Sequence, residues 1–395
     1  MSQLVAALDS SRVFAPTTRP LPADRLEVEI RRDLELHPDD EAAVDALVEI
    51  RPEVGVFMSR PWLSGFLADC PPGTEQALLL FRKGGALRAT VPIAISETLA
   101  HVRVRLLGGG LGSDRVDLLA ARGFEACAAD TFLMWLRGAF GPRGFVLELR
   151  DLCGTSALWG AIHRTGMERT QRLALQPREI YPLPYLPLPA AGIDRIADTP
   201  AASSLRSLDK HRRWLERRCR VRVERLDDLR DVMTAFEALI GFLAARWRDQ
   251  GGSALDNPRM LRFHRHVLPL LLRAGRLRMV RMCAGIRTVA VFYGLAAGTW
   301  WGYYLAGYDR DWAGRIHLGQ VNLAAAIEMA LREGATEFDF LKGAERMKYA
   351  WPVCERTALD ADVFSENATV QLTRATRATR DATAALTKSA RALFS

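Results

Sequence analysis

The stretch TEFDFLKGAERMKYAW, residues 336–351, carries the pattern that decides the fold. Residues 336–341 mix β-branched and aromatic types, and strand alternation places Phe338 and Phe340 on one face. Glu337 and Asp339 then share the other face. Two adjacent carboxylates in an interior strand are costly unless other groups pair with them or use them. The stretch therefore predicts a buried strand with a polar site against its acidic face.

The composition is that of a globular protein and excludes global disorder. The chain has 395 residues, of which 49% are hydrophobic and 25% charged, so it can form two domains that each bury a core. The formal net charge is +8, and most of the cations are arginines. This bias is weak evidence for nucleic-acid binding, although it suits a polyanionic ligand.

The cysteines are scattered singly, without a CxxC pair, and are expected to be reduced thiols. His264 and His266 cannot share one helix face, so we expect no metal site there. The N-terminus lacks the basic segment of a secretory signal, which predicts a cytoplasmic protein.

One uncharged stretch, residues 289–307, has the length of a membrane span. Its glycines (Gly294, Gly298 and Gly302) and its aromatic and β-branched residues favour a hairpin of two buried strands instead. We therefore expect no transmembrane segment. Contact of the arginine-bearing C-terminal tail with an anionic membrane surface stays open.

The two halves of the chain repeat one order of elements: helix, three-stranded meander, helix, strand. The second copy is the clearer one, with strands at 276–283, 288–296 and 299–306, a helix at 319–332 and a strand at 336–341. We predict an N-terminal domain at 24–190 and a C-terminal domain at 191–365 that carries the active cleft. A disordered tail at 1–23 and a basic tail rich in alanine, threonine and arginine at 366–395, outside the core, complete the chain.

Three connecting segments have simpler expected structures. The proline-rich residues 181–192 predict an extended crossover rather than a central strand. Residues 204–224 predict a basic helix, either solvated or a docking strip for the phosphates of an acceptor. GGGLG, residues 108–112, lacks the lysine of a P-loop and is expected to be a turn between strands.

A meander followed by a helix and a parallel strand resembles the core of the GNAT acyltransferases. Residues 306–351 also resemble the signature region of tandem GNAT-like proteins of the CelD/BcsL type, relatives of the Fem-type peptidyltransferases, and the looser resemblance spans 50–365. The aligned residues are Gly307, Asp309, Asp339, Phe340, Leu341, Gly343, Lys348 and Trp351, with Lys342 in place of an arginine and Met347 in place of a tyrosine. The resemblance implies an α/β fold with mixed sheets and two tandem GNAT-like (acyl-CoA N-acyltransferase) domains.

In a GNAT fold the last meander strand and the next parallel strand splay apart to receive the arm of coenzyme A. The resemblance places this splay between residues 299–306 and 336–341. The implied contacts with acetyl-CoA or another acyl-CoA are Tyr303, Tyr304, Leu305, Arg315, His317, Gly319 and Gln320. The usual pyrophosphate loop is not met, because Arg315 and Gly319 are one position too far apart.

Acyl transfer to an amine needs a base and a group that stabilises the oxyanion. The first candidate for a base or acceptor-orienting carboxylate is Asp339, followed by Glu345, while Lys348 and Tyr349 could bind substrate charge or protonate the leaving thiolate. The expected substrate-binding residues are Glu337, Lys342, Trp301 and Arg212. Alternatively, Asp339 and Lys348 form a buried ion pair with a structural role.

The function that follows is a metal-independent N-acyltransferase, most simply an acetyltransferase, that acts on an amine of a sugar, a polysaccharide or a cell-envelope precursor. One alternative keeps the fold and uses aminoacyl-tRNA as the donor. A second alternative is a non-catalytic scaffold subunit in polysaccharide biosynthesis, which the departure from the usual pyrophosphate loop favours.

Overall fold

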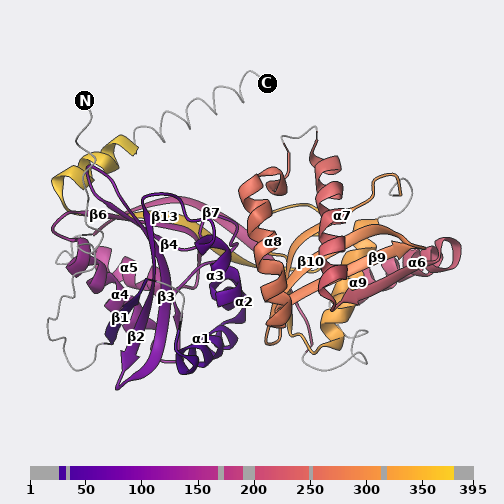
Figure 1. Cartoon of the computed structure of the whole chain (residues 1–395), viewed down its shortest axis with the longest axis horizontal. Helices are drawn as coiled ribbons and strands as arrows, with labels where there is room; N and C mark the ends of the chain where they lie inside the picture. The colour runs from indigo at the N-terminus through magenta and orange to yellow at the C-terminus, as the bar shows by residue number, and fades with distance from the viewer. Residues whose placement is uncertain are drawn as a thin grey trace.

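The structure is a computed structural model that describes residues 26–32, 36–167, 173–189, 201–248, 252–312 and 318–377. The molecule has two lobes along its long axis, formed by the N-terminal and the C-terminal halves of the chain (Figure 1). The predicted tail at 1–23 and most of the one at 366–395 lie outside the described residues, and the domain bounds remain a prediction.

One mixed, 13-stranded sheet runs through both halves. The strands of the N-terminal half are β1 (Glu27–Arg31), β2 (Thr74–Lys83), β3 (Ala86–Glu97), β4 (Val102–Leu106), β5 (Leu119–Ala120) and β6 (Phe145–Cys153). Those of the C-terminal half are β8 (Val221–Leu226), β9 (Leu277–Ala284), β10 (Arg287–Ala297), β11 (Trp300–Tyr308) and β12 (Glu337–Asp339). The halves meet at two long strands, β7 (Leu173–Pro187) and β13 (Cys354–Ser365).

The predicted repeat is confirmed by the strand pairing. In the N-terminal half, β2, β3 and β4 form an antiparallel meander, and β6 pairs parallel to β4 after helix α4 (Glu125–Phe140). In the C-terminal half, β9, β10 and β11 form the meander, and β12 pairs parallel to β11 after helix α9 (Leu318–Arg332). A parallel neighbour requires such a helical crossover, so the fold is a tandem α/β fold with a mixed sheet.

Helices cover both faces of the sheet (Figure 1). In β10, Val291, Tyr293 and Leu295 belong to the core that includes the helices α7 and α8, while Phe292 and Ala296 pack with α9. The remaining helices are α1 (Pro38–Ile50), α2 (Pro52–Met58), α3 (Arg60–Leu67), α5 (Ala157–Met167), α6 (Ala202–Cys219), α7 (Leu229–Trp247), α8 (Pro258–Arg273) and the short 3-10 helix η3 (Ala254–Asp256).

The predicted basic helix at 204–224 is a helix followed by a strand. Helix α6 ends at Cys219, because Arg220 adopts a left-handed conformation with φ 49°, and β8 begins at Val221. Valines at 221 and 223 support the strand, and β8 forms the outer edge of the sheet next to β9.

The prediction that residues 181–192 form a crossover rather than a central strand is wrong for 181–187, which belong to β7. This strand pairs with β13 on one side and with β12 on the other. The carbonyls of Pro182 and Pro184 accept hydrogen bonds from Gly343 and Phe340. In a strand, the N–H and C=O groups of one residue point to the same edge. The edge at which Pro182 and Pro184 lack an N–H therefore faces the chain beyond the end of β12, where no strand needs a donor.

The uncharged stretch at 289–307 forms the predicted hairpin. Strands β10 and β11 pair antiparallel from Ala290↔Tyr308 to Ala297↔Trp300, and the turn contains Gly298 at φ 50°. No helix among the described residues is long and apolar enough to cross a membrane.

The first part of the C-terminal tail packs against the fold, contrary to the expectation that it lies outside the core. Residues 368–377 are helical and lie beside the N-terminal half (Figure 1). Val370 is fully buried against Val146 and Phe364. These residues therefore contribute to the core of that half.

Val370→Ala is expected to lower the free energy of unfolding by about 2 kcal/mol, because two buried methyl groups are lost and a small cavity remains. Leu372→Ala is the matched control, since Leu372 is 71% exposed on the same helix and its truncation is expected to change stability by less than about 0.5 kcal/mol. Urea unfolding monitored by fluorescence measures both values. Equal effects of the two variants would contradict the packing of this helix.

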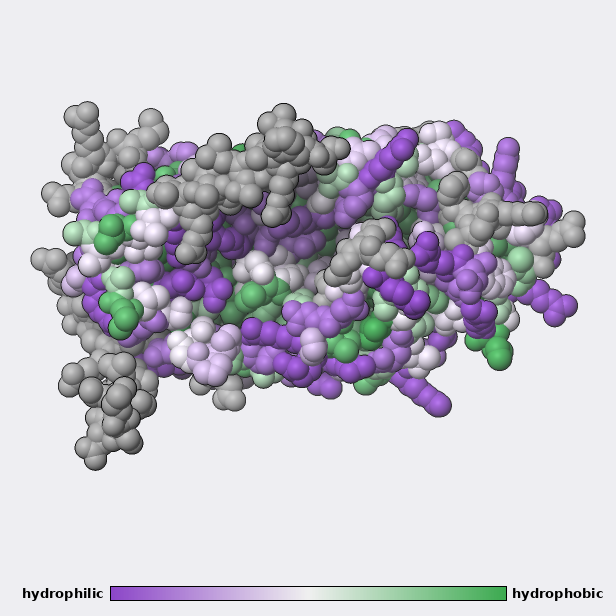
Figure 2. All heavy atoms as spheres, turned by 90° about the horizontal axis from the view of Figure 1, so that it is seen from above, coloured by the Kyte–Doolittle hydropathy of each residue, from purple (hydrophilic) through white to green (hydrophobic). Residues whose placement is uncertain are grey.

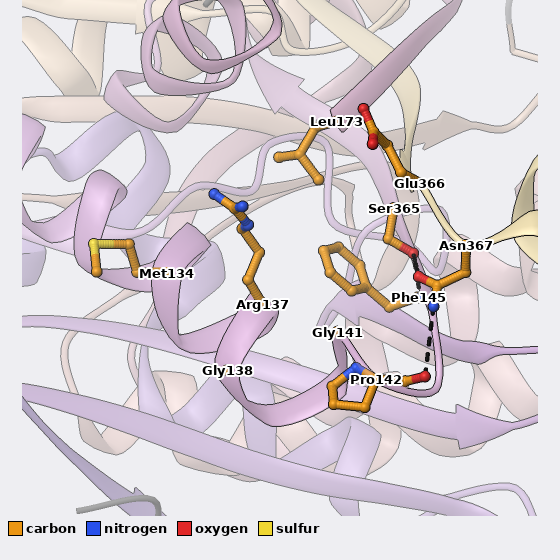
Figure 3. Close-up of a pocket in the computed structure, with 10 residues that line it drawn as sticks. All are labelled: Met134, Arg137, Gly138, Gly141, Pro142, Phe145, Leu173, Ser365, Glu366 and Asn367. Atoms are coloured by element: carbon orange, nitrogen blue, oxygen red, sulfur yellow. Dashed lines mark hydrogen bonds between the residues drawn. The ribbon is translucent and has the colours of Figure 1, made fainter. Parts of the chain in front are cut away.

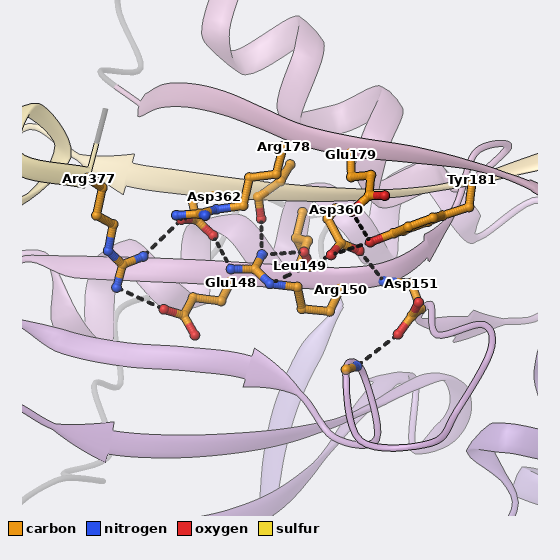
Figure 4. A network of polar contacts seen from close by, with 12 residues as sticks. Glu148, Leu149, Arg150, Asp151, Arg178, Glu179, Tyr181, Asp360, Asp362 and Arg377 are labelled. Carbon is orange, nitrogen blue, oxygen red and sulfur yellow. Dashed lines mark hydrogen bonds and ion pairs between the residues drawn. The ribbon is translucent and has the colours of Figure 1, made fainter. Parts of the chain in front are cut away.

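Arginines join the C-terminal helix to the two long central strands (Figure 4). Asp362 of β13 is fully buried and accepts hydrogen bonds from Arg150, Arg178 and Arg377. Burial alone would raise the pKa of Asp362, but its bond to Arg178 and the charge of Arg150 hold the pKa below its usual range. The network links β6, β7 and β13, so it ties together the strands where the halves meet.

An aromatic cluster forms a second junction between the halves. Trp62 of α3 stacks edge-on against Phe263 of α8 and Tyr304 of β11. His264 is buried in this cluster, with Nδ1 3.4 Å from the Tyr293 hydroxyl and Nε2 3.5 Å from the Tyr304 hydroxyl. Burial lowers the pKa of His264 to about 3, so the imidazole is neutral.

This neutral histidine predicts a loss of stability in acid. The unfolded chain binds a proton to His264 below about pH 6.5, whereas the folded chain does so only near pH 3. The stability that the neutral His264 contributes is therefore complete above about pH 6.5. Between about pH 6.5 and pH 3 it falls by up to about 1.4 kcal/mol per pH unit. Urea unfolding at several pH values should show a shallower decline for His264→Gln than for the unaltered chain, and identical pH dependences would contradict the assignment.

Candidate active site

Strands β11 and β12 pair over a short distance and then separate. Their parallel ladder joins Trp300 to Glu337, Trp301 to Phe338 and Gly302 to Asp339. Beyond this point, residues 303–308 of β11 pair with β10 on one edge, and no described strand pairs with the other edge. All of β12 is thus paired with β11, and instead of the predicted splay of two longer strands, β12 ends early and leaves residues 303–308 without a strand on one edge.

The separation begins where the chain turns sharply after Asp339. Leu341 has φ 57°, a left-handed conformation that is uncommon for leucine, and its N–H donates to Asp339 Oδ1 at 2.8 Å. The N–H of Phe340 instead donates to Pro184 of β7. For this reason β12 ends at Asp339, and the strand predicted at 336–341 is shorter than expected.

The alternation predicted for this stretch is confirmed. Phe338 and Phe340 are fully buried in one hydrophobic cluster. On the other face, Glu337 forms a bidentate ion pair with Arg356 of β13. Burial raises the pKa of Glu337 above its usual range, and Arg356 partly offsets this.

Asp339 is fully buried and its carboxylate is occupied. Oδ2 lies 2.5 Å from Nη2 of Arg115 and accepts a hydrogen bond from Trp300 Nε1 at 3.3 Å. Arg115 is also 0% exposed, and its guanidinium nitrogens make no hydrogen bond with the described residues, so the contact of Nη2 with Asp339 is an ion pair. The pair crosses between the halves, since Arg115 follows β4 and Asp339 ends β12. The partner of Asp339 is therefore Arg115, and the predicted alternative of an Asp339–Lys348 ion pair is wrong.

Lys348 organises the loop that follows β12. Its ammonium group donates to the carbonyl of Lys342 at 2.7 Å and lies 2.8 Å from Oε2 of Glu345. Lys348 is buried, whereas Glu345 and Tyr349 are largely exposed, and Tyr349 donates a hydrogen bond to Glu355. Of the predicted catalytic residues, Asp339 and Lys348 are thus buried, whereas Glu345 and Tyr349 face solvent.

A loop from the N-terminal half completes the site. GGGLG at 108–112 is a turn, as predicted, and it continues into Asp114 and Arg115. The Asp114 carboxylate accepts a hydrogen bond from the Lys342 N–H at 3.2 Å, and the Tyr304 hydroxyl donates to the Gly112 carbonyl at 2.8 Å. The loop therefore contacts both β11 and the segment after β12.

Asp114 has the most favourable position for proton transfer in this group. It is half-buried, so it keeps some contact with solvent. Burial and the neighbouring Asp151 raise its pKa to about 6, although the Lys342 N–H and the charge of Lys348 act against this. A carboxylate with a pKa near neutrality can accept and release a proton at physiological pH.

Lys342 is also held by residues of the N-terminal half of the chain. Its ammonium group lies 2.6 Å from Asp151 Oδ1 and 3.6 Å from the centre of the Tyr181 ring. Asp151 has φ 55°, and its other carboxylate oxygen accepts the Gly110 N–H at 2.8 Å. Asp114, Arg115 and Asp151 were not predicted as site residues, because nothing in the local sequence shows which distant segment they contact.

The residues predicted to bind the acyl donor occupy two places. Tyr303, Tyr304 and Leu305 lie on the part of β11 that β12 does not pair with. Gly319 and Gln320 begin α9, where Gln320 donates from Nε2 to the Met347 carbonyl at 3.3 Å. Arg315 and His317 lie outside the described residues.

Two predicted substrate-binding residues have structural partners. Trp301 is buried in the same cluster as Phe338. Arg212 of α6 pairs with Asp209, Glu216 and Glu328, which ties α6 to α9. Their roles in substrate binding stay a prediction.

A separate pocket of about 420 Å³ lies in the N-terminal half (Figure 3). It is formed by the end of α4, the start of β6 and residues 365–367, and Arg137 and Ser365 contribute polar groups. None of the predicted site residues lines it. The described residues contain no group of three or more His, Cys, Asp or Glu side chains placed to hold a metal ion.

One family model matches the second copy of the repeat. Residues 202–349 match the family model of the acetyltransferase (GNAT) domain. This match contains β11, α9 and β12, and it ends at Tyr349. No curated protein matches the chain.

The solved structure of FemX has the same fold over most of both chains. It superposes with a TM-score of 0.59 at 10% sequence identity and covers 88% of this chain and 99% of FemX. A conserved protein of unknown function from Bacteroides thetaiotaomicron matches with a TM-score of 0.49 at 11% identity, over 86% of this chain and 99% of its own. A tandem GNAT protein from the clavulanic acid biosynthesis pathway matches with a TM-score of 0.43 at 14% identity, over 86% and 99%. The chain therefore has the fold of FemX, with two copies of one α/β unit, of which the second matches the GNAT domain.

Proposed function

We propose that this protein transfers an acyl group from an acyl-CoA thioester to an amine, with the acceptor carried by a sugar, a polysaccharide or a cell-envelope precursor. The observation that carries the proposal is the separation of β11 and β12 after Gly302 and Asp339, inside the segment that matches the GNAT domain. The CelD/BcsL-like signature at 306–351 supports the class of acceptor.

The donor binds along the unpaired edge of β11. Backbone N–H and C=O groups of residues 303–308 hydrogen-bond the amide groups of the pantetheine arm, because these backbone groups have no ladder partner on that edge. The pyrophosphate lies at the start of α9, where free N–H groups and the helix dipole favour an anion. Glycine at position 319 lets the start of α9 lie close to the Tyr308 ring, because a Cβ there would meet the ring at 2.9 Å.

Asp114 acts as the general base. The amine nitrogen attacks the thioester carbonyl carbon, the carbon–sulfur bond breaks, and the amine proton passes to the Asp114 carboxylate while the thiolate leaves. The raised pKa of about 6 suits a base that works near neutral pH. Asp339 is a less suitable base because it is fully buried against Arg115, and it positions that arginine and the turn at Leu341 instead.

Lys342 and Lys348 supply positive charge beside Asp114. Both act on the Asp114 carboxylate electrostatically, and Lys342 is the more exposed of the two. This charge stabilises the thiolate that forms as the carbon–sulfur bond breaks. Glu345 and Tyr349, which face solvent, lie where an acceptor approaches the loop.

Calorimetric titration with acetyl-CoA tests the proposal. We expect a dissociation constant between about 1 μM and 1 mM, the range in which enzymes bind their substrates. ATP is the matched control ligand, because it has adenosine and phosphates but lacks the pantetheine arm, and it should bind more weakly. No heat with acetyl-CoA, or equal affinity for both ligands, would contradict the proposed donor and favour an aminoacyl-tRNA donor or a non-catalytic role.

A further inference from the structure

Helix α6 has one face built into the fold and one face in solvent. It lies at the end of the C-terminal half that is farthest from the N-terminal half (Figure 1). The inner stripe is Leu205, Leu208, Arg212, Leu215 and Cys219, spaced by three and four residues. Arg212 on this stripe pairs with Glu328 of α9, which fixes the helix against the core.

The outer stripe of α6 is cationic and repeats with the same spacing. It consists of Arg206, Lys210, Arg213 and Arg217, all of them exposed. At 1.5 Å per residue these positions span about 16 Å along one side of the helix. Such a row presents its charges to a single surface.

The charges of this outer stripe are mostly not neutralised within the protein. Asp209 pairs with Arg213 and Arg212. No described carboxylate lies within ion-pair distance of Arg206, Lys210 or Arg217, judged over the part of the chain that the structure covers. These three cations are therefore available to an external anion.

Trp214 lies beside this row and is 47% exposed. It is one turn away from Lys210 and Arg217, so the indole and the cations share one face. Indole groups favour the boundary between water and lipid headgroups, because the ring is apolar and the N–H is polar. Large exposed aromatic residues beside a row of cations are typical of helices that lie on membrane surfaces.

We propose that the outer stripe of α6, together with Trp214, is a peripheral binding surface for an anionic lipid bilayer. Charge complementarity supports this occupant, since each cation near an anionic membrane surface strengthens binding by about fivefold at moderate ionic strength. Trp214 adds contact with the headgroup region. The proposal is independent of the proposed acyl transfer.

A bilayer fits this surface better than a nucleic acid does. Single-stranded nucleic acid is bound in basic grooves with several aromatic side chains that stack on successive bases. The outer stripe lies on a convex helix and offers one exposed aromatic ring, Trp214. A planar anionic surface can contact the whole row at once.

Co-sedimentation with vesicles tests the proposal in the full-length protein. We expect binding to vesicles of phosphatidylcholine mixed with phosphatidylglycerol, weak binding to vesicles of pure phosphatidylcholine, and loss of binding at high salt. Lys210→Glu with Arg217→Glu should weaken binding at least about tenfold. Trp214→Ala should weaken it by a smaller factor.

The matched control is Arg164→Glu with Arg265→Glu, which makes the same charge change at exposed positions on other helices. This control should bind anionic vesicles as the unaltered chain does, and circular dichroism should show the same helix content for all variants. The proposal would be overturned if the two charge-reversed double variants lost binding to anionic vesicles to the same extent. Binding of single-stranded RNA, but not vesicles, that depends on Lys210 and Arg217 would also overturn it.

Discussion

Arg115→Met is expected to lower the free energy of unfolding by about 3–5 kcal/mol. Arg115 and Asp339 are both 0% exposed, and Nη2 of Arg115 lies 2.5 Å from Oδ2 of Asp339. Removing the guanidinium leaves a buried carboxylate with only Trp300 and the Leu341 N–H as close donors, because Arg356 is 3.9 Å away. Chemical denaturation measures the change. The m value, which is the slope of the free energy of unfolding against denaturant concentration, should stay constant between variants.

The double variant Arg115→Met with Asp339→Asn should recover part of this loss. It removes both charges together, so the penalty of an unpaired buried charge disappears. Arg265→Met is the control, since its pair with Glu237 is exposed and is worth at most about 1 kcal/mol. Strictly additive effects of the two single variants would show that these residues do not interact as the structure indicates.

Asp114→Asn is expected to reduce kcat/KM for acyl transfer by about 10²- to 10⁴-fold, the usual contribution of a general base. In the unaltered protein the rate should rise with pH through about 6, because the carboxylate must lose its proton before it can accept one from the amine. Release of the CoA thiol from acetyl-CoA in the presence of glucosamine measures the rate. The variant should also lose the rise near pH 6.

Asp130→Asn is the matched control for this change, because Asp130 is an exposed aspartate on α4. It should leave both the rate and its pH dependence as they are in the unaltered protein. Acetyl-CoA affinity should be similar in all three proteins, since Asp114 acts on the acceptor. A full rate in Asp114→Asn, with the same pH profile, would eliminate Asp114 as the base.

Local sequence patterns were sufficient to predict the repeat and which side chains of β12 face the hydrophobic cluster. The alternation of Glu337, Phe338 and Asp339 is a property of three neighbouring residues, and the hairpin at 289–307 follows from its glycines and aromatic residues. Such patterns do not depend on distant parts of the chain. The resemblance to GNAT proteins added the prediction that the strand at 336–341 lies parallel to residues 299–306, and β12 does pair parallel to β11.

The partners across the junction of the halves could not be predicted in this way. Arg115 and Asp339 are far apart in the chain, and no single segment shows that their side chains meet. The prediction for the proline-rich β7 failed for a related reason, because Pro182 and Pro184 face the chain beyond the point where β12 has ended. Asp114 had a weak signal, since it follows a glycine-rich turn within a segment that resembles the GNAT-like proteins loosely.

Amide hydrogen exchange with and without acetyl-CoA tests the central claim most directly. If the thioester arm binds along the free edge of β11, peptides covering residues 303–308 and the start of α9 should exchange more slowly when the ligand is present. Peptides from β1 and β2, in the other lobe, should be unchanged. Binding of acetyl-CoA without protection at 303–308 would contradict the account.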